Sequence, residues 1–281
     1  MLIHSASQLV CLRGGAQRGS RLGKLDILED GAVLVQDGSI QALGSSRDLL
    51  RRYPQEDKID ALQRVVMPGF VDPHTHLIWA GDRSNEFSMR LEGKSYMEIM
   101  AAGGGINATV QATRLASDKE LKVASTQRAW SALKHGTTTL EAKSGYALTV
   151  DGELRLLQVL MQLRDEIPLD ILPTFLGAHA VPPEFKDRPA EYTNLIIQHA
   201  LPQLKEWWHM HYPHERLPFV DVFCEPAVFN LEQTRVILST AKTLGFPLKI
   251  HADEFENIGG ASLAVSLGAD FADHPGKKNM G

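Results

Sequence analysis

Residues 65–76, Val65-Val66-Met67-Pro68-Gly69-Phe70-Val71-Asp72-Pro73-His74-Thr75-His76, combine an apolar run with two closely spaced histidines. The apolar run, residues 65–72, predicts a β-strand that ends just before His74. Residues i and i+2 of a strand point to the same side, so His74 and His76 can share one metal ion. Two solvated loop histidines would give the same pattern, and the pair alone does not decide between these readings.

Downstream of this stretch, short apolar runs alternate with amphipathic helical segments. Further strands are predicted at residues 137–142, 169–176, 219–225, 248–251 and 269–272. Ser117-x-x-Glu120 and Asn230-x-x-Gln233 are the capping patterns that open helices. The alternation predicts parallel βα units, as in a doubly wound sheet or a (β/α)₈ barrel. No GxGxxG motif opens a helix after the first strand, which disfavours a dinucleotide-binding fold.

Residues 1–64 have a different pattern of short strands and turns, with a hairpin signal at Asp37-Gly38. We expect a small β-sandwich subdomain over residues 1–64 and a second domain over residues 65–281.

The composition is that of a soluble globular enzyme, with 281 residues, 43% hydrophobic and 22% charged. A net charge of -5 and the absence of a basic run argue against nucleic acid or an anionic membrane as partner. Cys11 and Cys224 form no CxxC pair, which excludes a cysteine-type zinc site. No apolar run is long enough to span a bilayer. We therefore expect a cytoplasmic protein that acts on a small molecule.

Three more histidines follow predicted strands: His179, His251 and His274. Parallel α/β folds form their sites at the carboxyl ends of the strands, where His251 would supply a third nitrogen ligand. Catalytic zinc sites commonly use three protein ligands plus a water whose pKa the metal lowers. Glu254, three residues beyond His251, is placed to transfer protons. Taken alone, His251 could equally be a hydrogen-bonded core histidine.

Several motifs together resemble the amidohydrolase superfamily and, within it, the imidazolonepropionase family. Residues 68–76 resemble the first barrel strand of the superfamily. The more specific matches are residues 79–87, 101–106, 141–146, 177–180 and 250–254. The resemblance runs from about residue 65 to residue 274, and it implies a (β/α)₈ TIM-type barrel.

The resemblance also implies a reaction, in which a metal-activated water opens the ring C–N bond of 4-imidazolone-5-propanoate to give N-formimidoyl-L-glutamate in histidine degradation. His74, His76 and His251 would hold one zinc or iron ion, between which the sequence does not choose. The implied substrate-binding residues are Arg83, which would meet the propionate, and Tyr146, His179 and Glu254. Glu254 would also shuttle protons, and His274 would assist the developing oxyanion. Without the resemblance, Arg83 would be read as a surface ion pair and Tyr146 as a loop aromatic.

The predicted strand at residues 219–225 contains no lysine. Superfamily members with two metals often bridge them with a carbamylated lysine on that strand, so its absence favours one metal. Lys143 lies on a different strand and is assigned no metal role.

The chain departs from the family after His274. The family's aspartate ligand near the eighth strand has no counterpart, and six barrel strands are found where eight are needed. Open strand edges would leave backbone groups unpaired. We therefore expect a truncated barrel, either a splice form, a fragment or a gene-prediction error, that is poorly stable or inactive alone.

Two other functions remain open at this stage. The chain could be another amidohydrolase, such as a nucleobase deaminase, or a non-catalytic isoform that binds a full-length subunit. A homodimer is a further expectation, because family relatives are commonly dimers.

Overall fold

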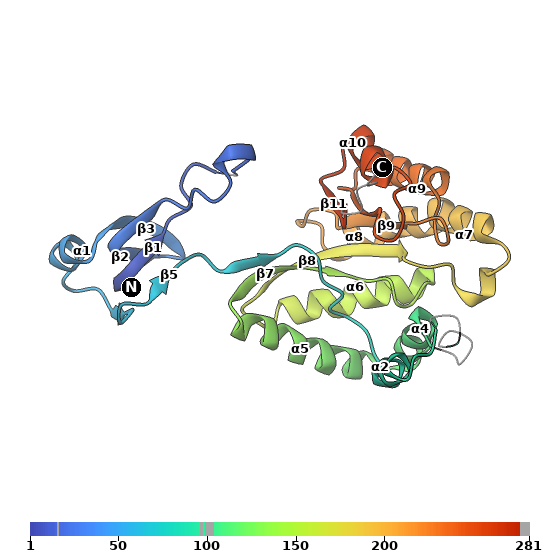
Figure 1. Ribbon diagram of the computed structural model, residues 1–281, viewed down its shortest axis with the longest axis horizontal. Coiled ribbons are helices and arrows are strands. Elements are labelled where there is room, and N and C mark those ends of the chain that lie inside the picture. The colour runs from blue at the N-terminus through green and yellow to red at the C-terminus, as the bar shows by residue number, and fades with distance from the viewer. Residues whose placement is uncertain (16, 96–97, 99–103, 276–281) are drawn as a thin grey trace. The chain divides into compact units, whose positions relative to one another are not determined.

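The computed structural model describes residues 1–15, 17–95, 98 and 104–275, and it divides the chain into two compact units (Figure 1). The first unit is Met1–Gly69 and the second is Phe70–Gly281. The assignment of residues 1–64 to a small β subdomain and of residues 65–281 to the barrel domain stays a prediction.

The first unit contains a five-stranded sheet with the order β3-β2-β1-β4, in which β5 also pairs with β1. Its elements are β1 (Leu2–Val10), η1 (Gly19–Arg21), β2 (Ile27–Gln36), β3 (Ser39–Ser45), α1 (Ser46–Arg52), β4 (Lys58–Asp60) and β5 (Val65–Val66). The hairpin expected at Asp37-Gly38 is present, with both residues at positive φ between β2 and β3.

A small apolar cluster in this unit brings Leu49 of α1 against Leu2 and Leu34 of the sheet. Helix α1 thus covers apolar residues that a second sheet would cover in a sandwich. The β-rich N-terminal region expected from the sequence is therefore present as a sheet covered by a helix, and the described residues of this unit contain this one sheet.

The second unit is built on a six-stranded sheet with the order β11-β10-β9-β8-β7-β6. The strands are β6 (Phe70–Asp72), β7 (Thr137–Lys143), β8 (Asp170–Ala178), β9 (Phe219–Cys224), β10 (Lys249–Ala252) and β11 (Phe271–Asp273). All five neighbouring pairs are parallel. A doubly wound sheet would reverse its strand order part-way, whereas this order follows the sequence throughout. The fold is therefore a curled, partial (β/α)₈ barrel with six strands, as the sequence predicted.

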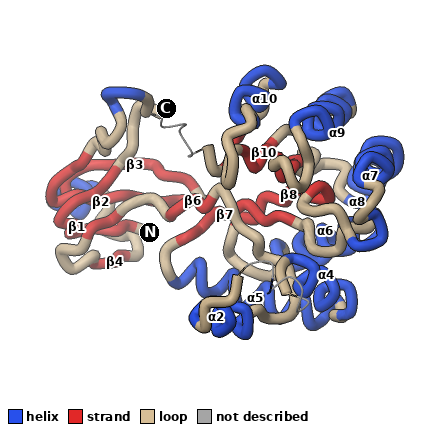
Figure 2. The backbone as a smooth tube through the Cα atoms, turned by 45° about the vertical axis from the view of Figure 1, so that its right-hand side comes forward, coloured by secondary structure: helices blue, strands red, loops and turns tan. Residues whose placement is uncertain are grey.

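Helices connect the strands and lie around the outside of the curled sheet (Figure 2). They are α2 (Ser84–Leu91), α4 (Ile106–Leu115), α5 (Asp118–Lys134), α6 (Val150–Arg164), η2 (Pro183–Phe185), α7 (Pro189–Leu195), η3 (Ile196–Ala200), α8 (Leu201–His211), α9 (Leu231–Thr243) and α10 (Gly260–Leu267). Both predicted capping boxes are formed, at Ser117 and Asn230. The main apolar core lies between these helices and the strands. None of the helices in the described ranges has the length and apolar character needed to cross a membrane.

The strand expected over residues 65–72 is divided between the two units. Val65–Val66 pairs with β1 in the first sheet, while Phe70–Asp72 pairs with β7 in the second. Pro68 has no N–H to donate to a strand ladder, and Gly69 follows it, which accounts for the break. His74 and His76 consequently lie in the loop after β6 and not within a strand.

Candidate metal centre

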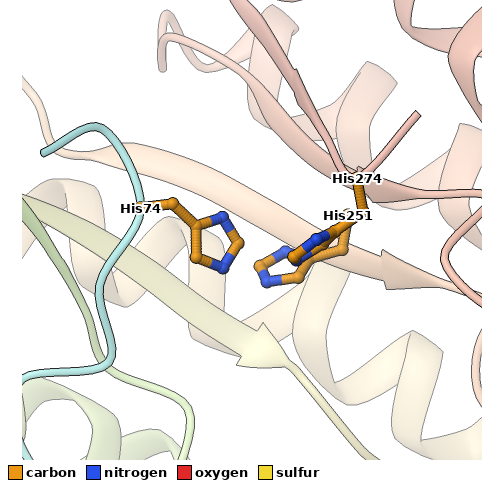
Figure 3. Close-up of side chains that lie close together, drawn as sticks. All are labelled: His74, His251 and His274. Atoms are coloured by element: carbon orange, nitrogen blue, oxygen red, sulfur yellow. The ribbon is translucent and has the colours of Figure 1, made fainter. Parts of the chain in front are cut away.

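Five histidines meet at the carboxyl ends of the barrel strands. His74 and His76 follow β6, His179 follows β8, His251 lies in β10 and His274 follows β11. The ring centroids of His74 and His251 are 4.6 Å apart, and those of His74 and His274 are 4.7 Å apart. Figure 3 shows these three rings turned toward one another.

One ligand atom from each of His74, His251 and His274 can be chosen so that all lie within 4.8 Å of one another. His76 lies just outside this group, with its ring centroid 5.4 Å from that of His74 and 5.7 Å from that of His251. It stacks on His179 at 5.0 Å. The structure therefore brings the expected ligands His74, His76 and His251 close together, but it places His274 nearer to the first and last of them than His76.

Buried ring nitrogens without partners show that these residues fit a metal ion. Nδ1 of His76 and both ring nitrogens of His251 are buried and have no hydrogen-bond partner among the described residues. Burial, followed by the neighbouring histidines, lowers the pKa of His76 to about 2. Burial and the charge of His251 likewise lower the pKa of His179 to about 4. Neutral imidazoles with unshared electron pairs are the form in which histidine binds zinc or iron.

Sequence reasoning missed two aspartates that contact the histidines, the buried Asp221 and the partly buried Asp273. Nδ1 of His74 is 2.9 Å from Oδ2 of Asp273, and Nδ1 of His251 is 2.9 Å from Oδ2 of Asp221. The second contact is close but does not have hydrogen-bond geometry. Metal-binding histidines typically direct their other ring nitrogen at a carboxylate in this way. Their positions in the sequence could have indicated them. Asp273 ends β11 just before His274, and Asp221 lies in β9.

Buried carboxylates also hold the loops that carry Tyr146 and Glu254. Glu153 of α6 accepts hydrogen bonds from the backbone N–H groups of the loop around Tyr146. Glu225, directly after β9, accepts N–H bonds from Glu254 and the two residues that follow it. Burial raises the pKa of the Tyr146 hydroxyl, while the positive charge of Arg83 opposes that rise. Arg83 is therefore close enough to Tyr146 to influence it electrostatically.

Arg83 itself is paired with Glu86 through two hydrogen bonds. Its Nε donates to Oε1 at 3.0 Å and its Nη2 donates to Oε2 at 2.8 Å. Glu86 also accepts the backbone N–H of Gly105 at 2.7 Å. The motif at residues 101–106 falls partly outside the described residues, because 101–103 are not among them.

Glu254 and His274 face each other at the exposed side of the site. Nε2 of His274 is 4.0 Å from Oε2 of Glu254, and their side chains are 38% and 34% exposed. His274 has a φ of 65°, an uncommon conformation for a residue other than glycine that tends to cluster at functional sites.

Comparison with known proteins shows what the chain is similar to. A family model described as amidohydrolase family matches residues 57–150. A second, the imidazolonepropionase-like composite domain of bacteria, matches residues 31–55. An imidazolonepropionase of Chloroflexus aggregans is 45% identical over 98% of this chain, and one of Brevibacillus brevis is 46% identical over 97%. The chain is similar to these two imidazolonepropionases. It spans 65% and 64% of the length of these two imidazolonepropionases.

Solved structures share the fold of this chain. A 5-methylcytosine deaminase of Klebsiella pneumoniae matches with a TM-score of 0.60 at 16% identity, over 94% of this chain and 54% of that protein. Ochratoxinase of A. niger matches with a TM-score of 0.57 at 15% identity, over 96% of this chain and 59% of that protein. Identities this low support the fold and nothing about the substrate.

Proposed function

We propose that the chain carries the metal site of an enzyme that hydrolyses the ring C–N bond of 4-imidazolone-5-propanoate to N-formimidoyl-L-glutamate. The observation that carries the proposal is the group of histidines at the strand ends, in which Nδ1 of His76 and both ring nitrogens of His251 are buried without a hydrogen-bond partner. The named relatives, at 45% and 46% identity, support this substrate over others.

His74, His76 and His251 are the proposed ligands of one zinc or iron ion. When bound, the ion would supply a water of lowered pKa and a Lewis acid for a carbonyl oxygen. Asp273 and Asp221 face Nδ1 of His74 and His251, which leaves Nε2 of each ring for the ion. His274 is the competing third ligand because it lies closer to His74 and His251.

The remaining residues would bind substrate and move protons. Glu254, held by Glu225, would hydrogen-bond the ring and carry a proton from the water to the leaving nitrogen. His274, facing Glu254, would stabilise the developing oxyanion. His179 and Tyr146, whose ring centroids lie 5.0 Å and 5.7 Å from that of His76, would contact the substrate's ring.

Arg83 is the proposed partner of the substrate's propionate. Glu86 holds the Nε–Nη2 edge of its guanidinium. Binding of a carboxylate through that edge, the geometry that gives two parallel hydrogen bonds, therefore requires the Arg83–Glu86 pair to open.

The test is an assay of ring opening with the purified chain in the presence of added zinc or iron. The proposal predicts hydrolysis of the imidazolone that is abolished in His251→Asn. The expectation from the sequence that the chain is inactive alone predicts no hydrolysis, so the assay decides between the two. The matched control His209→Asn changes an exposed histidine on α8 and should leave the rate unchanged. The absence of turnover with either metal, or faster hydrolysis of a nucleobase such as 5-methylcytosine, would contradict the proposal.

A further inference from the structure

Beside the histidines lies a mostly buried group of two lysines and three carboxylates, and its lysines have no part in the proposed reaction. Its members are Glu141, Lys143, Asp221, Lys249 and Asp273, which we call the buried charge cluster. The side chains of Lys143 and Asp221 are 0% exposed, and that of Lys249 is 1% exposed. Charged groups this deeply buried cost much free energy unless each is paired, so their arrangement requires an explanation.

Lys143 lies at the centre of the buried charge cluster. Its Nζ donates to Oε1 of Glu141 at 2.7 Å, to Oδ2 of Asp221 at 2.8 Å and to Oδ2 of Asp273 at 3.3 Å. Burial opposes the charged form, but Asp221 and Glu141 outweigh it and raise the pKa of Lys143. The ammonium thus occupies the space among these carboxylates with its positive charge.

The same two aspartate oxygens that bind Lys143 also face the metal-binding histidines. Oδ2 of Asp221 is 2.9 Å from Nδ1 of His251, and Oδ2 of Asp273 is 2.9 Å from Nδ1 of His74. Each oxygen therefore lies between a lysine ammonium and an imidazole. A displacement of the ammonium would move the oxygen that lies beside each Nδ1.

Lys249 and Glu141 hold the backbone on which His74 and His76 sit. Nζ of Lys249 donates to the carbonyl of Pro73 at 2.7 Å and lies 3.4 Å from Oδ2 of Asp273. Oε2 of Glu141 accepts the N–H of Thr75 at 3.2 Å. This segment is a loop and not a strand. The side-chain contacts therefore fix its backbone in place of the hydrogen bonds between strands that a sheet would supply.

We propose that Lys143 and Lys249 are positioning residues of the metal centre. They fix Asp221, Asp273 and the loop after β6, so that His251 and His74 carry their proton on Nδ1 and present Nε2 to one metal ion. This inference rests on the proposed function, because positioning the rings matters only if they bind a metal ion. The ring tautomers themselves can be measured without a metal.

The alternative use of the cluster is a second cation site. Ligand atoms of Asp221, His251 and Asp273 do lie within 4.8 Å of one another. However, Nζ of Lys143 is 2.8 Å and 3.3 Å from the two aspartates. The lysine ammonium thus already occupies the place that a second metal ion would need. The arrangement therefore predicts one metal ion per chain.

The experiment measures the ring tautomers in the metal-free full chain by long-range ¹H–¹⁵N NMR of ¹⁵N-histidine. The variants are Lys143→Met and Lys249→Met, and His74→Asn and His251→Asn assign the signals. Lys242→Met is the matched control, because Lys242 also donates to a backbone carbonyl, that of Leu267, but lies outside the cluster. A second readout is zinc affinity from competition with a chromophoric chelator, with circular dichroism to confirm folding.

We expect His74 and His251 to be Nδ1–H tautomers in the wild type and in Lys242→Met, and to become mixtures in the Lys143 variant. Lys249→Met should change His74 more than His251. Zinc affinity should fall by about 10- to 100-fold, the range typical for loss of a group that orients a metal ligand. If a lysine variant does not fold, Asp273→Asn replaces it and should change His74 alone.

Unchanged tautomers and unchanged zinc affinity in folded Lys143 and Lys249 variants would overturn the inference while leaving the proposed function intact. Tighter zinc binding, or two zinc ions per chain, in Lys143→Met would show that the lysine only repels cations, which also overturns it. A wild type that binds no zinc but shows the predicted tautomer changes would support the positioning role and reject the metal-dependent function.

Discussion

Glu153 offers a quantitative test of how the Tyr146 loop is held. Its side chain is 1% exposed. Oε1 accepts the N–H groups of Ala147 at 2.9 Å and Leu148 at 2.7 Å, and Oε2 accepts that of Gly145 at 2.6 Å. One carboxylate thus satisfies three buried backbone donors around Tyr146.

The two variants Glu153→Ala and Glu153→Gln should differ in a predictable order. The alanine leaves all three donors without their acceptor, at a cost of roughly 1–3 kcal/mol for each that stays unsatisfied. Glu153 lines a cavity of about 10 Å³, room for about one water, so solvent entering the enlarged space would offset part of this cost. We expect Glu153→Ala to lower the free energy of unfolding by about 3–6 kcal/mol in total. The glutamine can keep both bonds to its oxygen and loses the Gly145 bond, which should cost about 1–3 kcal/mol.

These losses in the free energy of unfolding can be measured by urea denaturation, with tryptophan fluorescence as the probe. All four tryptophans, Trp79, Trp130, Trp207 and Trp208, lie in the second unit, so the signal reports on that unit. Glu232→Ala is the control, because Glu232 is an exposed glutamate in the first turn of α9 and its loss should change stability by no more than ~0.5 kcal/mol. An alanine variant within about 1 kcal/mol of wild type, or a glutamine variant less stable than the alanine variant, would refute this reasoning.

Three further predictions use the same unfolding assay. Gly145→Ala should lose about 1–3 kcal/mol, because Gly145 has a φ of 102° and a Cβ there would lie 2.9 Å from the Leu176 carbonyl and 3.0 Å from Nδ1 of His179; a variant as stable as wild type would contradict it. In the metal-free chain, the depressed pKa values of His179, about 4, and His76, about 2, mean that the unfolded chain takes up protons near pH 6.5 that the folded chain does not. The free energy of unfolding should therefore be highest above pH 6.5 and fall as the pH drops toward 4, and it should fall less steeply in His179→Gln. Equal pH dependence in wild type and variant would count against buried neutral imidazoles. Saturating zinc at about 100 times its dissociation constant should raise the free energy of unfolding by about 2.7 kcal/mol, and removal with a chelator should reverse it; no change would argue against a metal site.

Local sequence signals predicted most of the second unit. The alternation of apolar runs and amphipathic segments predicted parallel strands with connecting helices, and the capping boxes at Ser117 and Asn230 mark true helix starts. These features depend on residues a few positions apart. The same holds for the histidines, because a residue that follows a parallel strand lies at the same edge as those that follow its neighbours.

The features that sequence reasoning missed depend on distant pairs. Asp273 meets His74 across 199 positions, and Lys249 meets Pro73 across 176. No local pattern specifies such contacts, and Lys143 and Lys249 read in the sequence as ordinary charged residues. The break of the strand at residues 65–72 was foreseeable from Pro68-Gly69, but the choice of β1 as partner for Val65–Val66 depends on the fold of the first unit.

Anomalous diffraction at the zinc edge from crystals of the zinc-loaded chain tests the central claim most directly. We predict one peak per chain, about 2.0–2.1 Å from ring nitrogens of His74 and His251 and of a third histidine, His76. The buried charge cluster should hold no second peak. A peak bound by Asp221 and Asp273 in the position of the Lys143 ammonium, or no peak near His74 and His251, would contradict the account.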